Sequence, residues 1–258
     1  MTFEDYILNP MGKQNAVLSA ITRESIRTNY SYRFDNILLR EGGKIQYYKY
    51  KTSNNEYIIH IKIPSEPVKK FYYDVVLKFS ANADVKGAGK NLLLYNFQAF
   101  SNDPAFVYNH AYVFKKNNLF FTDMTSKMGK RPLKEEPKVK NPDKVVAYVK
   151  SIYFAYLYMK NRGLFKTIAW ADAAAYDKKT LLNNVMSCDE KIALREEKEK
   201  EINHKKKIVV DDSLANRLSR SKQLSDSDKD RLVVRTTKKV PTVKKIKAVN
   251  STRRIKKR

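Results

Sequence analysis

The chain has 258 residues, is 42% hydrophobic and 12% aromatic, and carries a formal net charge of +25. Its single cysteine, Cys188, excludes an intramolecular disulfide and a cysteine-based zinc site. No apolar run reaches the roughly 18 residues of a membrane span, and the first residues lack the basic and apolar regions of a signal peptide. We therefore expect no membrane contact and synthesis in the cytoplasm.

Aromatic and charged residues are distributed very unevenly along the chain. All 30 aromatic residues lie at or before Tyr176. The segment 205–258 holds 19 Lys and Arg against 5 Asp and Glu, whereas 1–204 holds 33 against 22. A charged segment without aromatic residues cannot bury enough apolar surface to offset the entropy of its chain. The sequence therefore predicts a folded, basic body and a disordered basic arm over 205–258.

The first predicted elements are a mostly helical N-terminal segment, 1–43, and a β-hairpin over 44–63. In the second half of the hairpin, Ile59, Ile61 and Ile63 alternate with polar residues, which is typical of a half-buried strand. Four more strands are predicted over 71–80, 92–100, 105–114 and 119–121. The turns between them are too short for crossover helices, so the pairing should be antiparallel.

Helices are predicted for the part of the body after the strands. Asn141 is a good N-cap, Pro142 suits the first helical position and Asp143 suits the positive end of the helix dipole. This helix should end near 162, and two more should follow over about 165–176 and 179–200. The predicted fold is α+β: an antiparallel sheet packed by C-terminal helices, with a disordered basic C-terminal arm. The predicted regions are 1–43, 44–204 and 205–258.

The sequence gives little indication of catalysis. His60 and His110 are predicted on strands, facing solvent, without the spacing of metal ligands. Asp74 and Lys78 share one face of a predicted strand, but the Glu-x-Lys element of a restriction-type nuclease is missing, and Asp103 is explained as a turn residue. We expect no enzyme, no cofactor and no metal.

Aromatic residues and lysines are interleaved on the predicted sheet. Tyr47, Tyr48 and Tyr95, with lysines such as Lys49 close in sequence, could stack bases as in proteins that bind single strands. The favoured interpretation is that the aromatic residues form the core and a contact surface for other proteins.

The arm contains the predicted binding residues. Its basic clusters are suited to phosphate contacts and carry no geometry for reading a base sequence. The predicted nucleic-acid-binding residues are Lys238, Lys239, Lys244, Lys245, Lys247, Arg253, Arg254, Lys256, Lys257 and Arg258. The expected partner is nucleic acid, chiefly DNA, bound without sequence specificity. RNA, an acidic protein surface and a purely solubilising role stay open as alternatives.

The segment 93–108, Leu-Leu-Tyr-Asn-Phe-Gln-Ala-Phe-Ser-Asn-Asp-Pro-Ala-Phe-Val-Tyr, resembles strand–turn–strand segments in virion structural proteins of tailed bacteriophages. The resemblance implies a role in virion assembly, with other virion proteins as partners and an oligomer or larger assembly as the state of the protein. The sequence hypothesis is thus a non-enzymatic virion structural or assembly protein whose arm binds nucleic acid or an acidic lattice. The alternative is a single-stranded nucleic-acid-binding or regulatory protein that uses the aromatic sheet.

Overall fold

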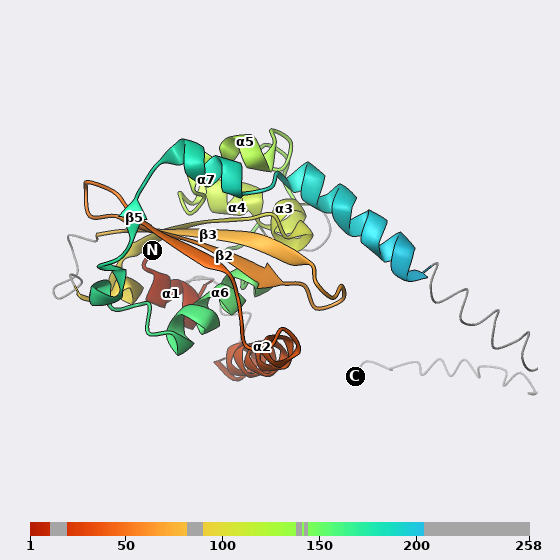
Figure 1. Ribbon diagram of the computed structural model, residues 1–258, viewed down its shortest axis with the longest axis horizontal. Coiled ribbons are helices and arrows are strands. Elements are labelled where there is room, and N and C mark those ends of the chain that lie inside the picture. The colour runs from red at the N-terminus through yellow and green to blue at the C-terminus, as the bar shows by residue number, and fades with distance from the viewer. Residues whose placement is uncertain (11–19, 82–89, 138–140, 142–143, 204–258) are drawn as a thin grey trace, which may run out of the picture. The chain divides into compact units, whose positions relative to one another are not determined.

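The computed structural model describes residues 1–10, 20–81, 90–137, 141 and 144–203. The chain divides into a first unit, Met1–Glu201, and a second unit, Ile202–Arg258. The predicted disordered arm, 205–258, lies outside the described residues. The first unit contains all the elements described below (Figure 1).

The centre of the first unit is a five-stranded sheet with the order β4-β3-β2-β1-β5. Its strands are β1 (Tyr47–Lys51), β2 (Tyr57–Pro64), β3 (Tyr72–Ser80), β4 (Asn96–Ser101) and β5 (Ala174–Ala175). All neighbours pair antiparallel except β1 and β5, which pair parallel. The α+β class and the mostly antiparallel sheet predicted from the sequence are confirmed.

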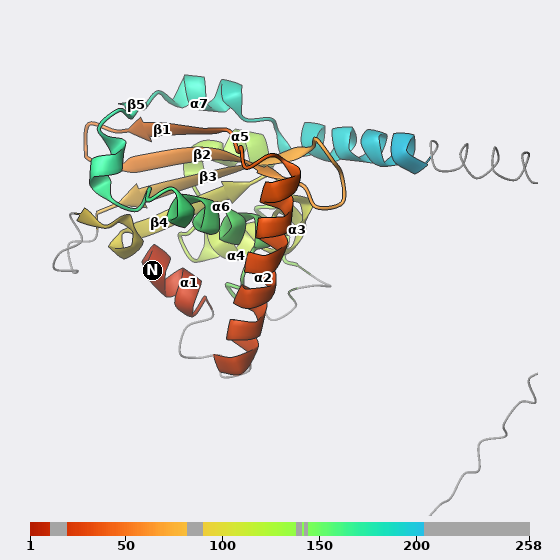
Figure 2. The ribbon, with the colours of Figure 1, turned by 60° about the horizontal axis from the view of Figure 1, so that its bottom comes forward.

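Helices cover both faces of the sheet. Figures 1 and 2 show α1, α2 and α6 on one face and α5 and α7 on the other, with α3 and α4 following β4. A further helix begins at 188. The α-helices labelled in Figure 1 are α1 (Phe3–Leu8), α2 (Ala20–Arg40), α3 (Pro104–Asn109), α4 (Ala111–Lys116), α5 (Thr125–Met128), α6 (Lys150–Asn161) and α7 (Lys178–Asn184).

The N-terminal helix α1 is part of the core. Thr2 and Asp5 form a reciprocal capping box at its start, which satisfies two backbone donors. The fully buried Phe3 ring lies 5.4 Å from the ring of Phe79 and 5.0 Å from that of Phe97. The buried Tyr6 hydroxyl accepts a hydrogen bond of 2.9 Å from the backbone N–H of Val149. Because of these contacts, α1 ties the sheet to the segment that leads into α6.

The two edges of the sheet differ in their backbone hydrogen bonds. At one edge is β5, which has only two residues and pairs with residues 50 and 51 of β1. At the other edge, the N–H of Phe97 in β4 bonds to the carbonyl of Met1 at 3.4 Å, and the N–H of Ala99 bonds to the carbonyl of Leu119 at 2.7 Å. The outer strand β4 therefore has backbone partners beyond the sheet.

Two predicted strands are wrong. The segment 105–114 forms α3 and α4, because Asp103 caps α3 by accepting from the N–H of Ala105 at 3.0 Å and Pro104 occupies the first helical turn. The turn signal was thus a helix start, and the segment 93–108 contains β4 followed by the start of α3. The predicted strand 119–121 is reduced to one bridge between Phe120 and Ala99.

The predicted helices also differ from those observed. Helix α6 begins at Lys150, and the Asn141 side chain instead bonds to the backbone of Val145; residues 142–143 lie outside the described residues. The predicted helix 165–176 is a short 3-10 helix, η4 (Thr167–Trp170), followed by β5. Among the described residues, 3-10 turns also form η2 (Leu92–Leu94), at the start of the predicted fourth strand, and η3 (Thr122–Met124).

Candidate nucleic-acid interface

The ten basic residues predicted to contact nucleic acid, 238–258, lie outside the described residues, as does His204. The structure does describe the helix that precedes the arm. The hydroxyl of Ser187 accepts from the N–H of Glu190, and the Glu190 carboxylate accepts from the N–H of Ser187 at 3.0 Å, so a capping box starts this helix. The break at 185–187 separates it from α7, where one continuous helix was predicted over 179–200.

The start of this helix is anchored in the body. Cys188 is buried, and its Sγ lies 3.7 Å from the Sδ of Met128 in α5. Burial raises the pKa of the Cys188 thiol to about 12, so it stays a thiol at neutral pH. Cys188 therefore packs in the core as a small apolar side chain.

The aromatic residues of the sheet are mostly core residues. Tyr57, Tyr95 and Phe97 are buried, and Tyr47 and Tyr48 are half-buried. Tyr47 packs edge-on against Tyr158 of α6 at 5.6 Å. In the described part of the chain, helices cover both faces of the sheet, which leaves no open aromatic platform of the kind that stacks successive bases.

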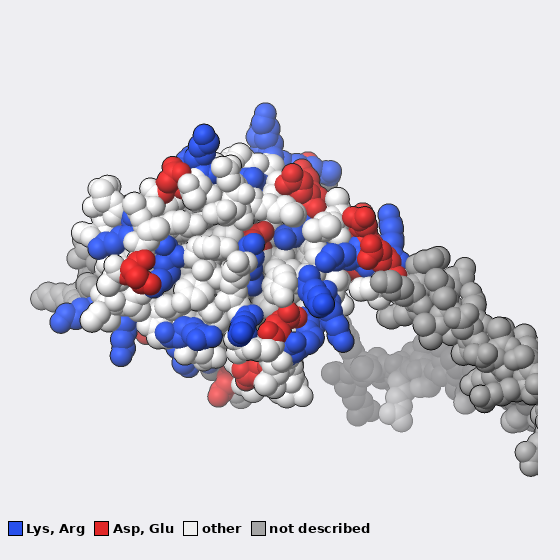
Figure 3. Space-filling view, viewed as in Figure 1, with Lys and Arg blue, Asp and Glu red and all other residues white. Residues whose placement is uncertain are grey.

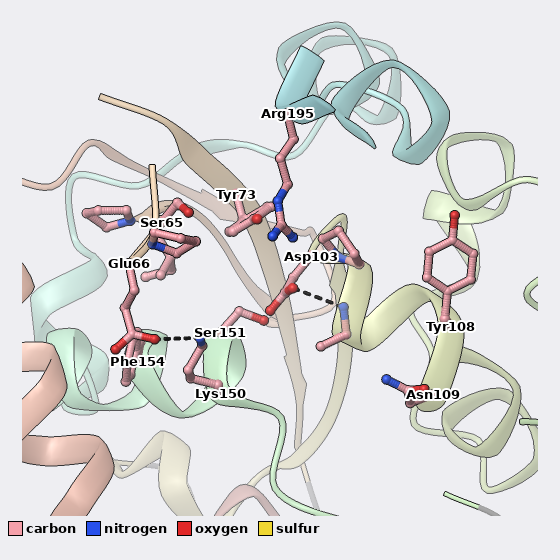
Figure 4. A pocket seen from close by; sticks show the side chains of 15 residues that line it. Ser65, Glu66, Tyr73, Asp103, Tyr108, Asn109, Lys150, Ser151, Phe154 and Arg195 are labelled. Atoms are coloured by element: carbon pink, nitrogen blue, oxygen red, sulfur yellow. Dashed lines mark hydrogen bonds and ion pairs between the residues drawn. The ribbon is translucent and has the colours of Figure 1, made fainter. Parts of the chain in front are cut away.

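A cavity of about 500 Å³ lies beside the end of the sheet (Figure 4). Its walls come from the loop after β2, from α3, from α6 and from the helix that begins at 188. Arg195 points from that helix toward Tyr73 and Asp103. The Lys150 ammonium donates to Glu66 at 2.6 Å, and Arg195 donates to Glu199 at 2.8 Å. Because its cations already have carboxylate partners, the cavity has no evident preference for an anion.

Asp103 is the buried acid of this cavity. Burial raises the pKa of its carboxyl, although the hydrogen bond from Ala105 and the charge of Lys150 act in the opposite direction. Asp103, predicted as a turn residue, is the N-cap of α3. Its burial depends on α6 and the C-terminal helix, which no local pattern around 103 could indicate.

We expect Asp103→Asn to stabilise the protein at neutral pH and to have little effect near pH 3. An acid with a raised folded-state pKa stabilises the fold while it is protonated, and this stabilisation is lost as pH rises from the ordinary pKa through the raised one. Asn keeps the capping oxygen without the charge. Urea unfolding of both proteins at several pH values measures the difference.

Asp177→Asn is the matched control. Asp177 also caps a helix, α7, but it is exposed, and its hydrogen bonds with Thr180 lower the pKa of its carboxyl. The Asp177 carboxylate should stabilise the fold above its ordinary pKa, and this stabilisation should be lost as pH falls. The effect of the control substitution on the free energy of unfolding should therefore change with pH in the opposite direction. Equal slopes for the two variants would contradict the assignment for Asp103.

A second polar cluster is buried in the other face of the sheet. His60 is fully buried, and its Nε2 lies 2.9 Å from Oδ1 of Asp74, which is only 3% exposed. Asn102 donates to Oδ2 of Asp74 at 2.8 Å, and its own side-chain oxygen accepts from the N–H of Asp74. Although burial raises the pKa of Asp74, the His60 hydrogen bond and nearby positive charge hold it below its ordinary value.

The prediction of solvent-facing strand histidines is wrong. His60 is in β2, but both faces of β2 are covered. His110 is at the junction of α3 and α4, where burial lowers its pKa to about 4. Since a carboxylate only accepts, Nε2 of His60 carries the hydrogen bonded to Asp74. The Nδ1 atom of His60 is buried without a hydrogen-bond partner among the described residues.

Within the described ranges, no three His, Cys, Asp or Glu side chains gather in a way that could hold a metal ion. Among the described helices, none combines the length and apolar character that crossing a membrane requires.

No family model, no curated protein and no solved structure matches this chain. The interpretation of its function therefore depends on its own residues.

Proposed function

We propose that this protein is a nucleic-acid-binding assembly protein, in which the folded body carries the basic arm 205–258 and the arm binds the polyanion by charge. The observation that carries the proposal is the excess of 19 Lys and Arg over 5 Asp and Glu in this arm. Binding of phosphates by such cations releases counterions from the nucleic acid and is independent of base sequence.

The body supports this function in two ways. The helix before the arm starts at a capped, buried position, so the arm is joined to a firmly packed element. The body is also basic, with 33 Lys and Arg against 22 Asp and Glu over 1–204, and Figure 3 shows Lys and Arg side chains across much of the face it displays. The positive electrostatic field of such a body raises the rate at which it encounters a polyanion.

The assembly part of the proposal concerns contacts with other proteins. Tyr32 and Leu39 are 69% and 78% exposed and lie two turns apart on one side of α2, where they offer apolar contact. The proposed setting is the virion of a tailed bacteriophage, and the support for that setting is the resemblance of 93–108. Sedimentation of the natural full-length protein, compared with that of the double variant Tyr32→Ser/Leu39→Ser, measures whether this surface drives self-association.

The test of nucleic-acid binding neutralises the ten basic residues of 238–258 as Gln in the full-length protein. If about eight arm charges meet duplex phosphates, the slope of log affinity against log salt should be about −7 in the natural protein. We expect a much shallower slope and at least about a hundredfold weaker binding for the variant. Anisotropy titrations with duplex and single-stranded DNA over a salt series measure both.

The matched control is a protein whose residues 205–258 are shuffled with their composition kept. Since the proposed binding depends on charge and not on order, the shuffled arm should bind as the natural arm does. Unchanged affinity in the neutral variant, or loss of affinity on shuffling, would contradict the proposal.

A further inference from the structure

Five lysines surround one pocket on the face of the sheet that α5 and α7 cover. We call it the lysine pocket, and its volume is about 480 Å³. The lysines come from β2, the loop before β3, α5 and the helix that begins at 188. The last two residues of α7, Asn183 and Asn184, also line the pocket. The five are Lys62, Lys70, Lys127, Lys191 and Lys198.

Lys191 is the deepest of the five and is only 8% exposed. Its Nζ lies 3.7 Å from Oδ2 of Asp74 and 5.1 Å from the centre of the Phe71 ring. The Lys198 ammonium lies 5.8 Å from the same ring. Burial lowers the pKa of Lys191, and the charges of Lys62 and Lys198 lower it further against the opposing effect of Asp74. The ammonium groups thus crowd one another around Phe71.

The acids of the pocket do not balance these charges. Asp74 already accepts from His60 and Asn102, and Glu190 accepts from the backbone of Ser187. In the part of the chain that the structure describes, neither Lys62 nor Lys70 forms an ion pair with a carboxylate, and Lys198 donates only to the carbonyl of Lys70, at 3.4 Å. An anion in the pocket would relieve the repulsion and satisfy free ammonium donors.

The donors favour a phosphate group among anions. Lysine is a compact point charge with three donors and binds phosphate from several directions, whereas planar carboxylates are best matched by the fork of an arginine. The pocket contains no arginine, and the Asn183 and Asn184 amides can add neutral hydrogen bonds. Its volume exceeds that of a single phosphate, so an attached sugar also fits.

We propose that the lysine pocket binds a phosphate group of the nucleic-acid backbone, as a second contact in addition to the arm. This inference rests on the proposed function and adds a site on the folded body. Lys198 precedes the arm, which starts at 205, by seven residues, so the pocket and the arm are adjacent along the chain.

The test is the full-length variant Lys62→Gln/Lys70→Gln/Lys198→Gln, with the arm and the buried Lys191 intact. We expect about tenfold weaker binding to a 20-nucleotide single strand, and a salt slope shallower by about one because one phosphate contact is lost. The control is Lys115→Gln/Lys116→Gln/Lys160→Gln, which removes the same charge from exposed positions elsewhere and should bind within about twofold of the natural protein.

Pyrophosphate is the second probe, because its binding to the lysine pocket does not require the arm. It should raise the melting temperature of the natural protein and of the control variant, but not that of the pocket variant, since a ligand that binds only the folded state stabilises it. If the triple variant fails to fold, the single reversal Lys198→Glu replaces it, with the same expected losses for both probes.

The outcomes separate this inference from the proposed function. Equal DNA binding by the pocket and control variants overturns the pocket as a backbone contact while the arm proposal stands. Failure of the natural protein to bind DNA, with pyrophosphate stabilisation lost only in the pocket variant, overturns the nucleic acid as the source of the phosphate. No response to pyrophosphate in any variant overturns the phosphate site.

Discussion

Replacing Asp74 by Ala should destabilise the protein by about 3–5 kcal/mol, the range for removing one partner of a buried charged pair. The carboxylate holds the imidazole of His60 at 2.9 Å and the amide of Asn102 at 2.8 Å, and it is the carboxylate nearest to Lys191. Without the Asp74 carboxylate, the side chains of His60 and Asn102 stay buried and lose their hydrogen-bond acceptor. Leaving buried donors unpaired costs more free energy than the hydrogen bonds themselves contribute. Guanidinium unfolding of the natural protein and the variant measures the loss.

Asp172→Ala is the control for Asp74→Ala. Asp172 pairs with Lys49, but its side chain is 77% exposed, and pairs of this kind contribute at most about 1 kcal/mol. A double-mutant cycle of Asp74→Ala with His60→Ala then isolates the coupling of the two side chains. A loss below about 1 kcal/mol for Asp74→Ala would contradict the buried network.

Replacing Phe3 by Ala should cost about 3–5 kcal/mol, as for other buried aromatic residues. The Phe3 ring is fully buried and lies within 6.1 Å of the rings of Tyr6, Tyr156 and Phe165, in addition to those of Phe79 and Phe97. Truncation removes its dispersion contacts and leaves a cavity between α1, the sheet and α6. The free energy of unfolding and its denaturant slope measure the effect.

Leu8→Ala in the same helix is the control for Phe3→Ala. Leu8 is 53% exposed, and its truncation should change the free energy of unfolding by no more than about 0.5 kcal/mol. Similar small effects for both variants would mean that α1 is not a structural part of the body.

The sheet could be predicted from local patterns because its central strands alternate strongly. The alternation of Ile59, Ile61 and Ile63 with polar residues indicated β2, although its burial does not alternate, because Ile58 and His60 on the other face are also fully buried. The segment 105–114 was mistaken for a strand because Phe106, Val107 and Val113 belong to residue types that favour strands. Their helical structure follows from the cap at Asp103 and from the core contacts of Phe106 and Phe114, whose rings lie 5.1 Å apart.

The buried clusters could not be predicted, because they depend on register and on distant segments. His60 pairs with Val76, and Lys62 pairs with Asp74, so His60 and Asp74 lie on one face of neighbouring strands. Nothing in the local sequence specifies that register or the cover over the face. The cover comes from the segment around Cys188 and Lys191, more than a hundred residues further along the chain.

The hydrogen bonds at the β4 edge limit how another chain can pair with this sheet. Proteins often associate by adding a strand to an unpaired sheet edge, which also promotes uncontrolled aggregation. Here Met1, Leu119 and Phe121 bond to the backbone of β4, and β5 forms the other edge with only two residues. Strand addition is therefore blocked at these positions of β4, whereas β5 covers only residues 50 and 51 of β1.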